Sequence, residues 1–180
     1  MTKSTSNGKK NGRPEKPARR QSPGFQELLR QGTRALQQGQ PNQAVRLLEQ
    51  AHRLDRDNPD AALNLSGAYI LVKKFKRAVD ILEPMSRREP DNPMVWTNLG
   101  AAYLGNPVLA GDEQQQRAID AFKKALELDP ATPHVAYNLG LIYLDRREQS
   151  AALHWFHQAV LADPHDRDAQ RYINGLSDKQ

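Results

Sequence analysis

The chain has 180 residues, no cysteine and a formal net charge of +5 at pH 7, and its isoelectric point is about 9.6. The charge is concentrated at one end. Residues 1–24 contain seven Lys or Arg against a single acid, Glu15, whereas residues 25–180 contain 19 basic and 20 acidic side chains. The basic isoelectric point therefore describes the N-terminal segment and does not by itself indicate a nucleic-acid-binding fold. The absence of Cys excludes disulfide scaffolds, thiol catalysis and Cys-based zinc sites.

Residues 1–24 are rich in Gly, Pro, Ser, Asn and basic side chains. Such a composition cannot offset the entropy cost of ordering the chain, so we predict a disordered basic tail. No apolar run reaches the ~18 residues that a membrane span needs, and no hydrophobic segment of a secretory signal follows the N-terminal charges. We therefore expect a cytoplasmic protein without a membrane span, with a folded part that begins at residue 25.

The rest of the chain contains an internal repeat. Four segments superimpose, 25–58, 59–92, 93–132 and 133–166, of which the third carries a six-residue insertion. The repeated columns of small residues are Gly32, Ser66, Gly100 and Gly140, then Ala44, Ala78, Ala118 and Ala152, then Ala51, Met85, Ala125 and Ala159. The repeated columns of large residues are Leu65, Leu99 and Leu139, then Tyr69, Tyr103 and Tyr143, then Leu48, Leu82, Phe122 and Phe156.

The spacing of these columns predicts two helices in each unit. Leu99, Gly100 and Tyr103 are three and four residues apart, as on one face of a helix, and Ala118 and Phe122 have the same spacing in a second helix. Small residues on the facing stripes let two helix backbones approach. Each unit is therefore predicted to be a helical hairpin, and stacking of the units buries the stripes that one hairpin leaves exposed.

This pattern resembles the tetratricopeptide repeat (TPR) over residues 25–166. The fourth unit matches the family's small and aromatic positions with Leu139, Gly140, Tyr143, Ala152, Phe156, Ala159 and Pro164. The first unit departs most, with Gln31, Ala35 and Arg56 where Leu, Tyr and Pro are expected, as is common for a terminal repeat. The resemblance implies an all-α, right-handed superhelical α-solenoid of four TPR-like helical hairpins.

The segment 167–180 follows the last repeat. Tyr172, Ile173 and Leu176 stand at helical spacing among charged residues. We predict a short C-terminal capping helix that covers the exposed face of the fourth unit and then frays.

Two features interrupt the repeat. Pro84 lies inside the predicted second helix of unit two, where it removes a backbone hydrogen bond, so we expect that helix to kink or to end loosely near Glu83. The insertion in unit three lies within 105–116, where Asp112 and Gln115 are candidates for capping a lengthened helix. The insertion is interpreted as a tolerated surface loop or, alternatively, as a lip over a binding groove.

No pattern indicates an enzyme. The Walker loop, the GxSxG elbow, the dinucleotide glycine fingerprint and HExxH are all absent from the sequence. His154 and His157 are three residues apart without a nearby third ligand, so we expect them on the outer surface rather than in a metal site. Trp96 and Trp155 are expected to fill the core. The sequence therefore indicates a non-catalytic protein that needs neither a cofactor nor a metal.

The resemblance implies that the first helix of each hairpin lines a concave groove, which in the family binds extended or helical peptide segments. One column before the repeated Leu, the chain has Arg30, Asn64, Asn98 and Asn138. An Asn side chain offers both a donor and an acceptor to a peptide backbone. Hydrogen bonds of these amides to neighbouring helices are an equally weighted alternative.

The candidate peptide-binding residues of the groove are Asn64, Asn98, Asn138, Gly67, Leu71, Met94, Ala101, Tyr137 and Leu141. They describe an apolar groove with spaced amides and few charges, which is typical of an interaction site. Chaperone-binding members of the family clamp an acidic C-terminus with Lys, Asn and Arg. In those columns this chain has Leu29, Thr33, Asn64, Met94 and Asn98, of which only one agrees, so we expect a groove that is not a carboxylate clamp.

The sequence thus favours a protein–protein interaction scaffold whose partner it does not name. Two alternatives stay open. The tail of residues 1–24 would bind nucleic acid or an anionic surface by charge alone, with strong salt dependence. The hairpin stack would instead bind further copies of itself as a self-assembling scaffold.

Overall fold

The computed structural model describes residues 23–106, 110–132 and 134–177. Within these ranges every regular element is a helix. The helices are α1 (Pro23–Gln37), α2 (Pro41–Leu54), α3 (Pro59–Leu71), α4 (Phe75–Arg88), α5 (Pro93–Leu104), α6 (Asp112–Leu128), α7 (Val135–Asp145), α8 (Gln149–Ala162) and α9 (Arg167–Ser177). The predicted tail lies outside the described residues, except that α1 begins at Pro23, two positions before the expected boundary.

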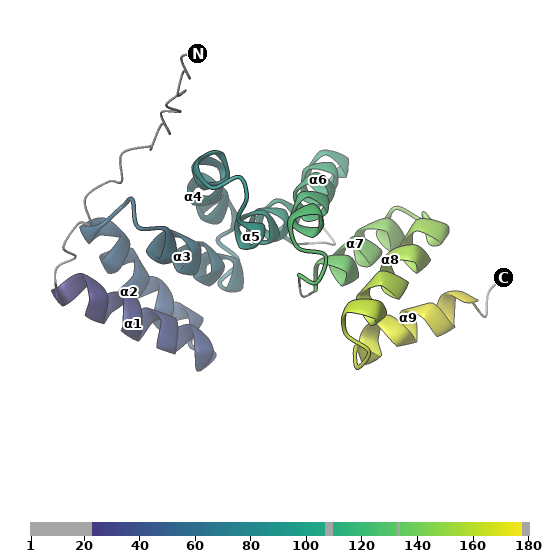
Figure 1. Cartoon of the computed structure of the whole chain (residues 1–180), viewed down its shortest axis with the longest axis horizontal. Coiled ribbons are helices and arrows are strands. Elements are labelled where there is room, and N and C mark those ends of the chain that lie inside the picture. Colours follow the sequence, from purple (N-terminus) through teal and green to yellow (C-terminus); the bar gives the residue numbers. More distant parts are fainter. Residues whose placement is uncertain (1–22, 107–109, 133, 178–180) are drawn as a thin grey trace, which may run out of the picture.

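The helices form four antiparallel hairpins in chain order, and α9 packs on the last of them (Figure 1). The first helices of the first three hairpins touch, since α1 contacts α3 and α3 contacts α5. Successive second helices are separated by surface hollows, which open between α2 and α4, between α4 and α6, and between α6 and α8. A stack that is tighter along its first helices curves toward them. The predicted all-α solenoid with a capping helix is therefore confirmed.

Within each hairpin the two helices cross at the small-residue column. A Cβ added at Gly100 would lie 2.6 Å from Cδ1 of Phe122, and one added at Gly140 would lie 2.6 Å from Cε1 of Phe156. Both phenylalanines are completely buried. Because glycine has only a hydrogen at this position, the aromatic ring of the partner helix packs into the space that a side chain would fill.

A partly buried hydrogen bond links the first hairpin to the second. The Tyr69 hydroxyl on α3 donates to Oε1 of Glu49 on α2 at 2.7 Å, and Arg77 of α4 lies 3.3 Å from the same oxygen. The guanidinium of Arg77 also lies over the Tyr69 ring, 5.7 Å from its centroid. Burial, and then the hydrogen bond to Glu49, raise the pKa of Tyr69. One unit later the same arrangement recurs with Tyr103, Glu83 and Arg117, at 3.0 Å for the hydrogen bond and 2.6 Å for the ion pair.

Of the two outcomes expected at Pro84, a kink or a loose end of α4 near Glu83, the loose end is wrong. The helix continues past Pro84 to Arg88, and the Ser86 hydroxyl donates to the Glu83 carbonyl at 3.0 Å. Met85 is buried in the core. Its burial stabilises this turn and offsets the loss of one backbone hydrogen bond at Pro84.

The expected capping of α6 by its own first turn is also wrong. The helix begins after Gly111, which makes no side-chain cap. Gln115 is buried instead, and its Nε2 donates to Oδ2 of Asp145 on α7 at 2.7 Å. The side chain therefore links the third hairpin to the fourth. The possible lip over the groove falls partly on residues 107–109, outside the described residues.

The two tryptophans are only half-buried, although both pack against core residues. Trp96 reaches the surface with its indole nitrogen, which donates to the Pro90 carbonyl at 2.8 Å. His154 and His157 are exposed, as expected.

We predict that Gly100→Ala destabilises the protein by about 1–3 kcal/mol, because the added methyl group overlaps the Phe122 ring. Gly67 on α3 is the matched control, since a Cβ there meets only Nδ2 of Asn98, at 3.9 Å. Gly67→Ala should stabilise the helix by about 0.5–1 kcal/mol. Urea unfolding followed by circular dichroism measures both changes. Equal effects of the two substitutions would contradict the close crossing.

We predict that Tyr103→Phe lowers the free energy of unfolding by about 1 kcal/mol, because it removes one hydrogen bond. Tyr143→Phe is the control, because the Tyr143 hydroxyl has no hydrogen-bond partner within the described ranges, and it should change stability by less than about 0.5 kcal/mol. Burial and the bond to Glu83 raise the pKa of Tyr103. Its stabilising contribution is therefore complete below pH 10 and is lost as the pH rises further. Thermal unfolding between pH 8 and pH 11 measures the difference, which should shrink at the alkaline end.

Candidate functional site: the concave groove

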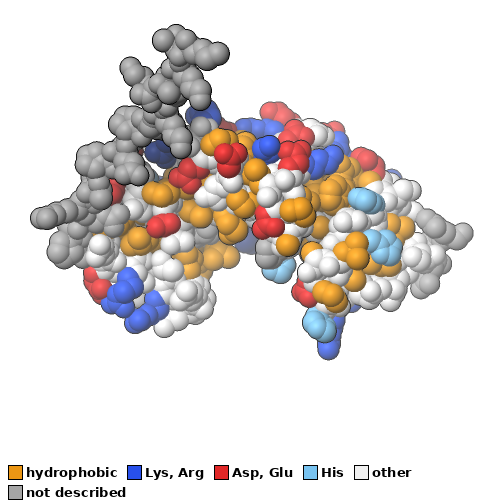
Figure 2. All heavy atoms as spheres, in the orientation of Figure 1, with side chains coloured by type: hydrophobic (Ala, Val, Ile, Leu, Met, Phe, Trp, Pro, Cys, Tyr) orange, Lys and Arg blue, Asp and Glu red, His pale blue; other side chains and the backbone are white. Residues whose placement is uncertain are grey.

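The nine candidate residues all lie on first helices. Asn64, Gly67 and Leu71 are on α3, Met94, Asn98 and Ala101 are on α5, and Tyr137, Asn138 and Leu141 are on α7. They recur at equivalent positions of the repeat, as Asn64, Asn98 and Asn138 do, and so lie on one face of each first helix. Figure 2 shows that the side of the molecule between its two ends is hollowed, with hydrophobic side chains near the hollow. We call this surface the concave groove.

The three asparagines differ in what they bond. Nδ2 of Asn64 donates to the Thr33 hydroxyl on α1 at 3.0 Å, and that hydroxyl donates in turn to the Leu29 carbonyl at 2.9 Å. Asn98 and Asn138 are half-buried, and neither side chain has a hydrogen-bond partner among the described residues. Asn64 therefore ties two helices together, whereas the amides of Asn98 and Asn138 are free to bind another chain.

Two large apolar side chains of the groove face solvent. Leu71 is 60% exposed and Met94 is 46% exposed. Gly67 lies between the first two asparagines on this surface and adds no side chain, which leaves space above the Asn98 amide. Exposed apolar surface next to free amides is suited to an extended peptide, whose backbone and side chains both need partners.

The groove ends at an aromatic cluster. The Tyr137 ring lies 5.8 Å from Phe156 and 6.2 Å from Tyr172, and Phe156 and Tyr172 stack 4.7 Å apart. Burial raises the pKa of Tyr137, and the neighbouring Tyr172 and the acids Asp168 and Asp166 add to the effect. At neutral pH the phenol is therefore a neutral donor on the groove wall.

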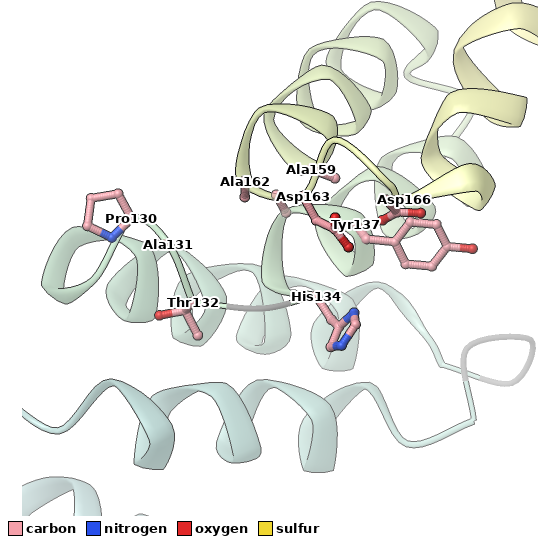
Figure 3. A pocket seen from close by; sticks show the side chains of 10 residues that line it. Pro130, Ala131, Thr132, His134, Tyr137, Ala159, Ala162, Asp163 and Asp166 are labelled. Atoms are coloured by element: carbon pink, nitrogen blue, oxygen red, sulfur yellow. The ribbon is translucent and has the colours of Figure 1, made fainter.

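A pocket of about 290 Å³ opens beside Tyr137 (Figure 3). Its walls come from the α6–α7 turn, from α7 and from the end of α8 with the turn that follows; the side chains that line it include Thr132, His134, Tyr137, Asp163 and Asp166. Sequence reasoning missed this pocket. The only signal was the small side chain of Ala162, which stands in the column occupied by Leu54, Arg88 and Leu128.

The groove lacks the charges of a carboxylate clamp. At the positions compared above, Leu29 is half-buried and the Thr33 hydroxyl is occupied by Leu29 and Asn64. Neither position can supply a cation to a terminal carboxylate.

Nothing in the described part of the chain indicates catalysis. Among those residues, no group of three or more His, Cys, Asp or Glu is arranged to hold a metal ion. Within the same ranges, no helix has both the length and the apolar character of a transmembrane segment.

Comparison with known proteins identifies the family of the chain. Two family models, both described as tetratricopeptide repeat, match residues 35–102 and 108–167. No curated protein matches the chain in sequence. TTC0263, a thermophilic TPR protein of Thermus thermophilus, superimposes with a TM-score of 0.73 at 20% identity, covering 86% of this chain and 82% of that one. MamA from Desulfovibrio magneticus RS-1 gives 0.71 at 19% identity, covering 88% and 86%. The family models and the stacked hairpins agree, and the chain belongs to the tetratricopeptide repeat family.

Proposed function

We propose that the protein is a non-catalytic scaffold that holds a peptide segment of a partner protein in its concave groove. One observation supports this most strongly: the half-buried amides of Asn98 and Asn138 have no partner among the described residues, and they lie on the same surface as exposed Leu71 and Met94. A half-buried polar group without a partner gains a hydrogen bond when a peptide backbone arrives.

The occupant that fits this surface is an internal segment with apolar side chains, not a free acidic C-terminus. The amides would bind the peptide backbone irrespective of sequence. Leu71, Met94 and Leu141 would contact its side chains, and the pocket beside Tyr137 has room for one more of them. Asn64 contributes less to binding in this proposal, because its donor already bonds Thr33.

Peptides selected from a random 12-residue display library on the full chain test this proposal. For the best peptides, we expect Asn98→Ala combined with Asn138→Ala to weaken binding by about 2–3 kcal/mol, since two hydrogen bonds are lost. Gly67→Leu should also weaken binding, because the new side chain fills the groove. Fluorescence anisotropy of labelled peptides measures both effects.

Gln43→Ala is the matched control, because it removes an exposed amide from α2, outside the groove. The Gln43→Ala variant should bind the selected peptides with the same affinity as the unchanged protein. Circular dichroism must show the same helicity in all variants. Should every selected peptide bind the two groove variants as tightly as the unchanged protein, the groove would not be the binding surface.

A second candidate function rests on the charge of residues 1–24, which carry seven basic side chains against one acid. An anionic polymer or membrane surface would bind such a segment by counterion release. We expect that deletion of residues 1–22 removes binding to heparin and that the affinity of the full chain falls steeply with salt concentration. Retention of heparin binding by the truncated protein, measured by elution from a heparin column, would eliminate this function.

A further inference from the structure

The outer face of the stack carries three related hollows. Each lies between two successive second helices: about 400 Å³ between α2 and α4, about 490 Å³ between α4 and α6, and about 270 Å³ between α6 and α8. Because the repeats superimpose, the side chains around one hollow have counterparts around the others. Comparing the three hollows therefore identifies the positions at which one hollow has a different side chain from its counterparts.

The first two hollows are closed at one edge by the same polar trio. In the α2–α4 hollow, Glu49 accepts from the Tyr69 hydroxyl and pairs with Arg77. In the α4–α6 hollow the counterparts are Glu83, Tyr103 and Arg117. In both, a carboxylate from one hairpin satisfies a hydroxyl and a cation from the next hairpin.

The third trio lacks its carboxylate. The tyrosine is retained as Tyr143, but Lys123 stands in the glutamate column and Ala151 in the arginine column. The Lys123 ammonium lies 6.0 Å from the centroid of the Tyr143 ring. Across the described ranges, Lys123 makes no ion pair and the Tyr143 hydroxyl has no acceptor. Lys123 and Tyr143 do not line the α6–α8 hollow itself; beside it they present a cation and a donor without the carboxylate that completes the other two trios.

Large apolar side chains stand at two positions of the third hollow. Leu126 and Trp155 line it, where the α2–α4 hollow has His52 and Ile81 and the α4–α6 hollow has Ser86 and Ala121. The neighbouring Glu127 pairs with Lys124, and His154 lies edge-on to the Trp155 ring, with the ring centroids 5.2 Å apart. In the space-filling view, hydrophobic side chains gather between α6 and α8 beside basic and histidine side chains (Figure 2).

The charged and apolar parts of this surface adjoin. Lys123 and Leu126 are three residues apart on α6, and Ala151 and Trp155 are four apart on α8, so each pair shares one face of its helix. Tyr143 and Trp155 pack against the same buried cluster, which includes Phe122 and Leu139. A short segment of another chain can therefore contact both parts at once.

We propose that the α6–α8 hollow is a second docking site, on the outer face, for a partner segment that carries a Glu or Asp next to a bulky apolar residue. The partner carboxylate takes the place that Glu49 and Glu83 occupy in the other hollows, between Lys123 and the Tyr143 hydroxyl. The neighbouring apolar side chain packs on Leu126 and Trp155. This site is separate from the concave groove and does not depend on it.

The same displayed 12-residue library, selected on the full chain, provides the probes. Among the enriched peptides we expect a class in which an acidic residue stands beside Leu, Phe or Trp. These peptides should bind Lys123→Glu and Trp155→Ala at least tenfold more weakly. They should bind the Asn98→Ala and Asn138→Ala double variant with unchanged affinity, so that failure of the groove proposal and failure of this one are distinguishable.

Lys124→Glu is the charge-matched control, because it makes the same charge change one residue away, on the side of the α4–α6 hollow. It should change affinity less than threefold. In a Trp96→Phe background Trp155 is the only tryptophan, and a docked peptide should shift its fluorescence emission.

A restoring variant separates docking from a purely structural effect. Lys123→Glu combined with Ala151→Arg rebuilds the trio found in the other hollows, so we expect a higher unfolding temperature together with loss of the acidic peptides. The proposal is overturned if no selected peptide depends on Lys123, if the dependent peptides lack acidic residues, or if the restored variant still binds them. It is also overturned if light scattering shows a dimer that Lys123→Glu dissociates, because the occupant would then be a second copy of the chain.

Discussion

The structure depends on one steric constraint, the close crossing of two helices at a residue without a large side chain. Gly100 and Gly140 each leave space for a phenylalanine ring from the second helix of the same hairpin. The ring lies so close that a methyl group in place of the glycine hydrogen would overlap it. This contact fixes how the two helices of a hairpin pair. Successive hairpins then stack along the chain, which makes one side of the stack concave.

The curvature gives the inner and outer faces different properties. On the inner side α1, α3 and α5 touch in succession, and the first helices bear amides and apolar side chains. On the outer side the second helices diverge, and hollows remain between them. Polar trios such as Glu83, Tyr103 and Arg117 bridge two of these hollows and hold successive hairpins together. The hollow between α6 and α8 has lost that bridge, which is why it is the outer-face candidate for a partner.

Much of the fold was predictable because the repeated columns report packing directly. The register of Gly140, Tyr143 and Phe156 was enough to pair two helices, and the spacing of Ile173 and Leu176 was enough to place a capping helix. The continuation of α4 past Pro84 to Arg88 was not predictable from local propensity, because burial of Met85 outweighs one missing hydrogen bond.

The site was predictable only in outline. The sequence placed Asn64 and Asn98 on one surface, yet it did not show that Asn64 bonds Thr33 on the preceding helix. The contact between Gln115 and Asp145 depends on the course of the inserted segment, which no repeat column describes. The small side chain of Ala162 is part of the lining of the pocket beside Tyr137, and a missing side chain gives little signal in a sequence.

The central claim is the close crossing of the two helices of a hairpin, which in the third and fourth hairpins is a contact between glycine and phenylalanine. Nuclear Overhauser spectroscopy of the isotopically labelled full chain measures it directly, through the α protons of Gly100 and Gly140. Strong cross-peaks from these protons to the ring protons of Phe122 and Phe156, respectively, are the predicted result. Helical chemical shifts without those cross-peaks would mean that the helices pair differently, and would contradict the arrangement of both faces.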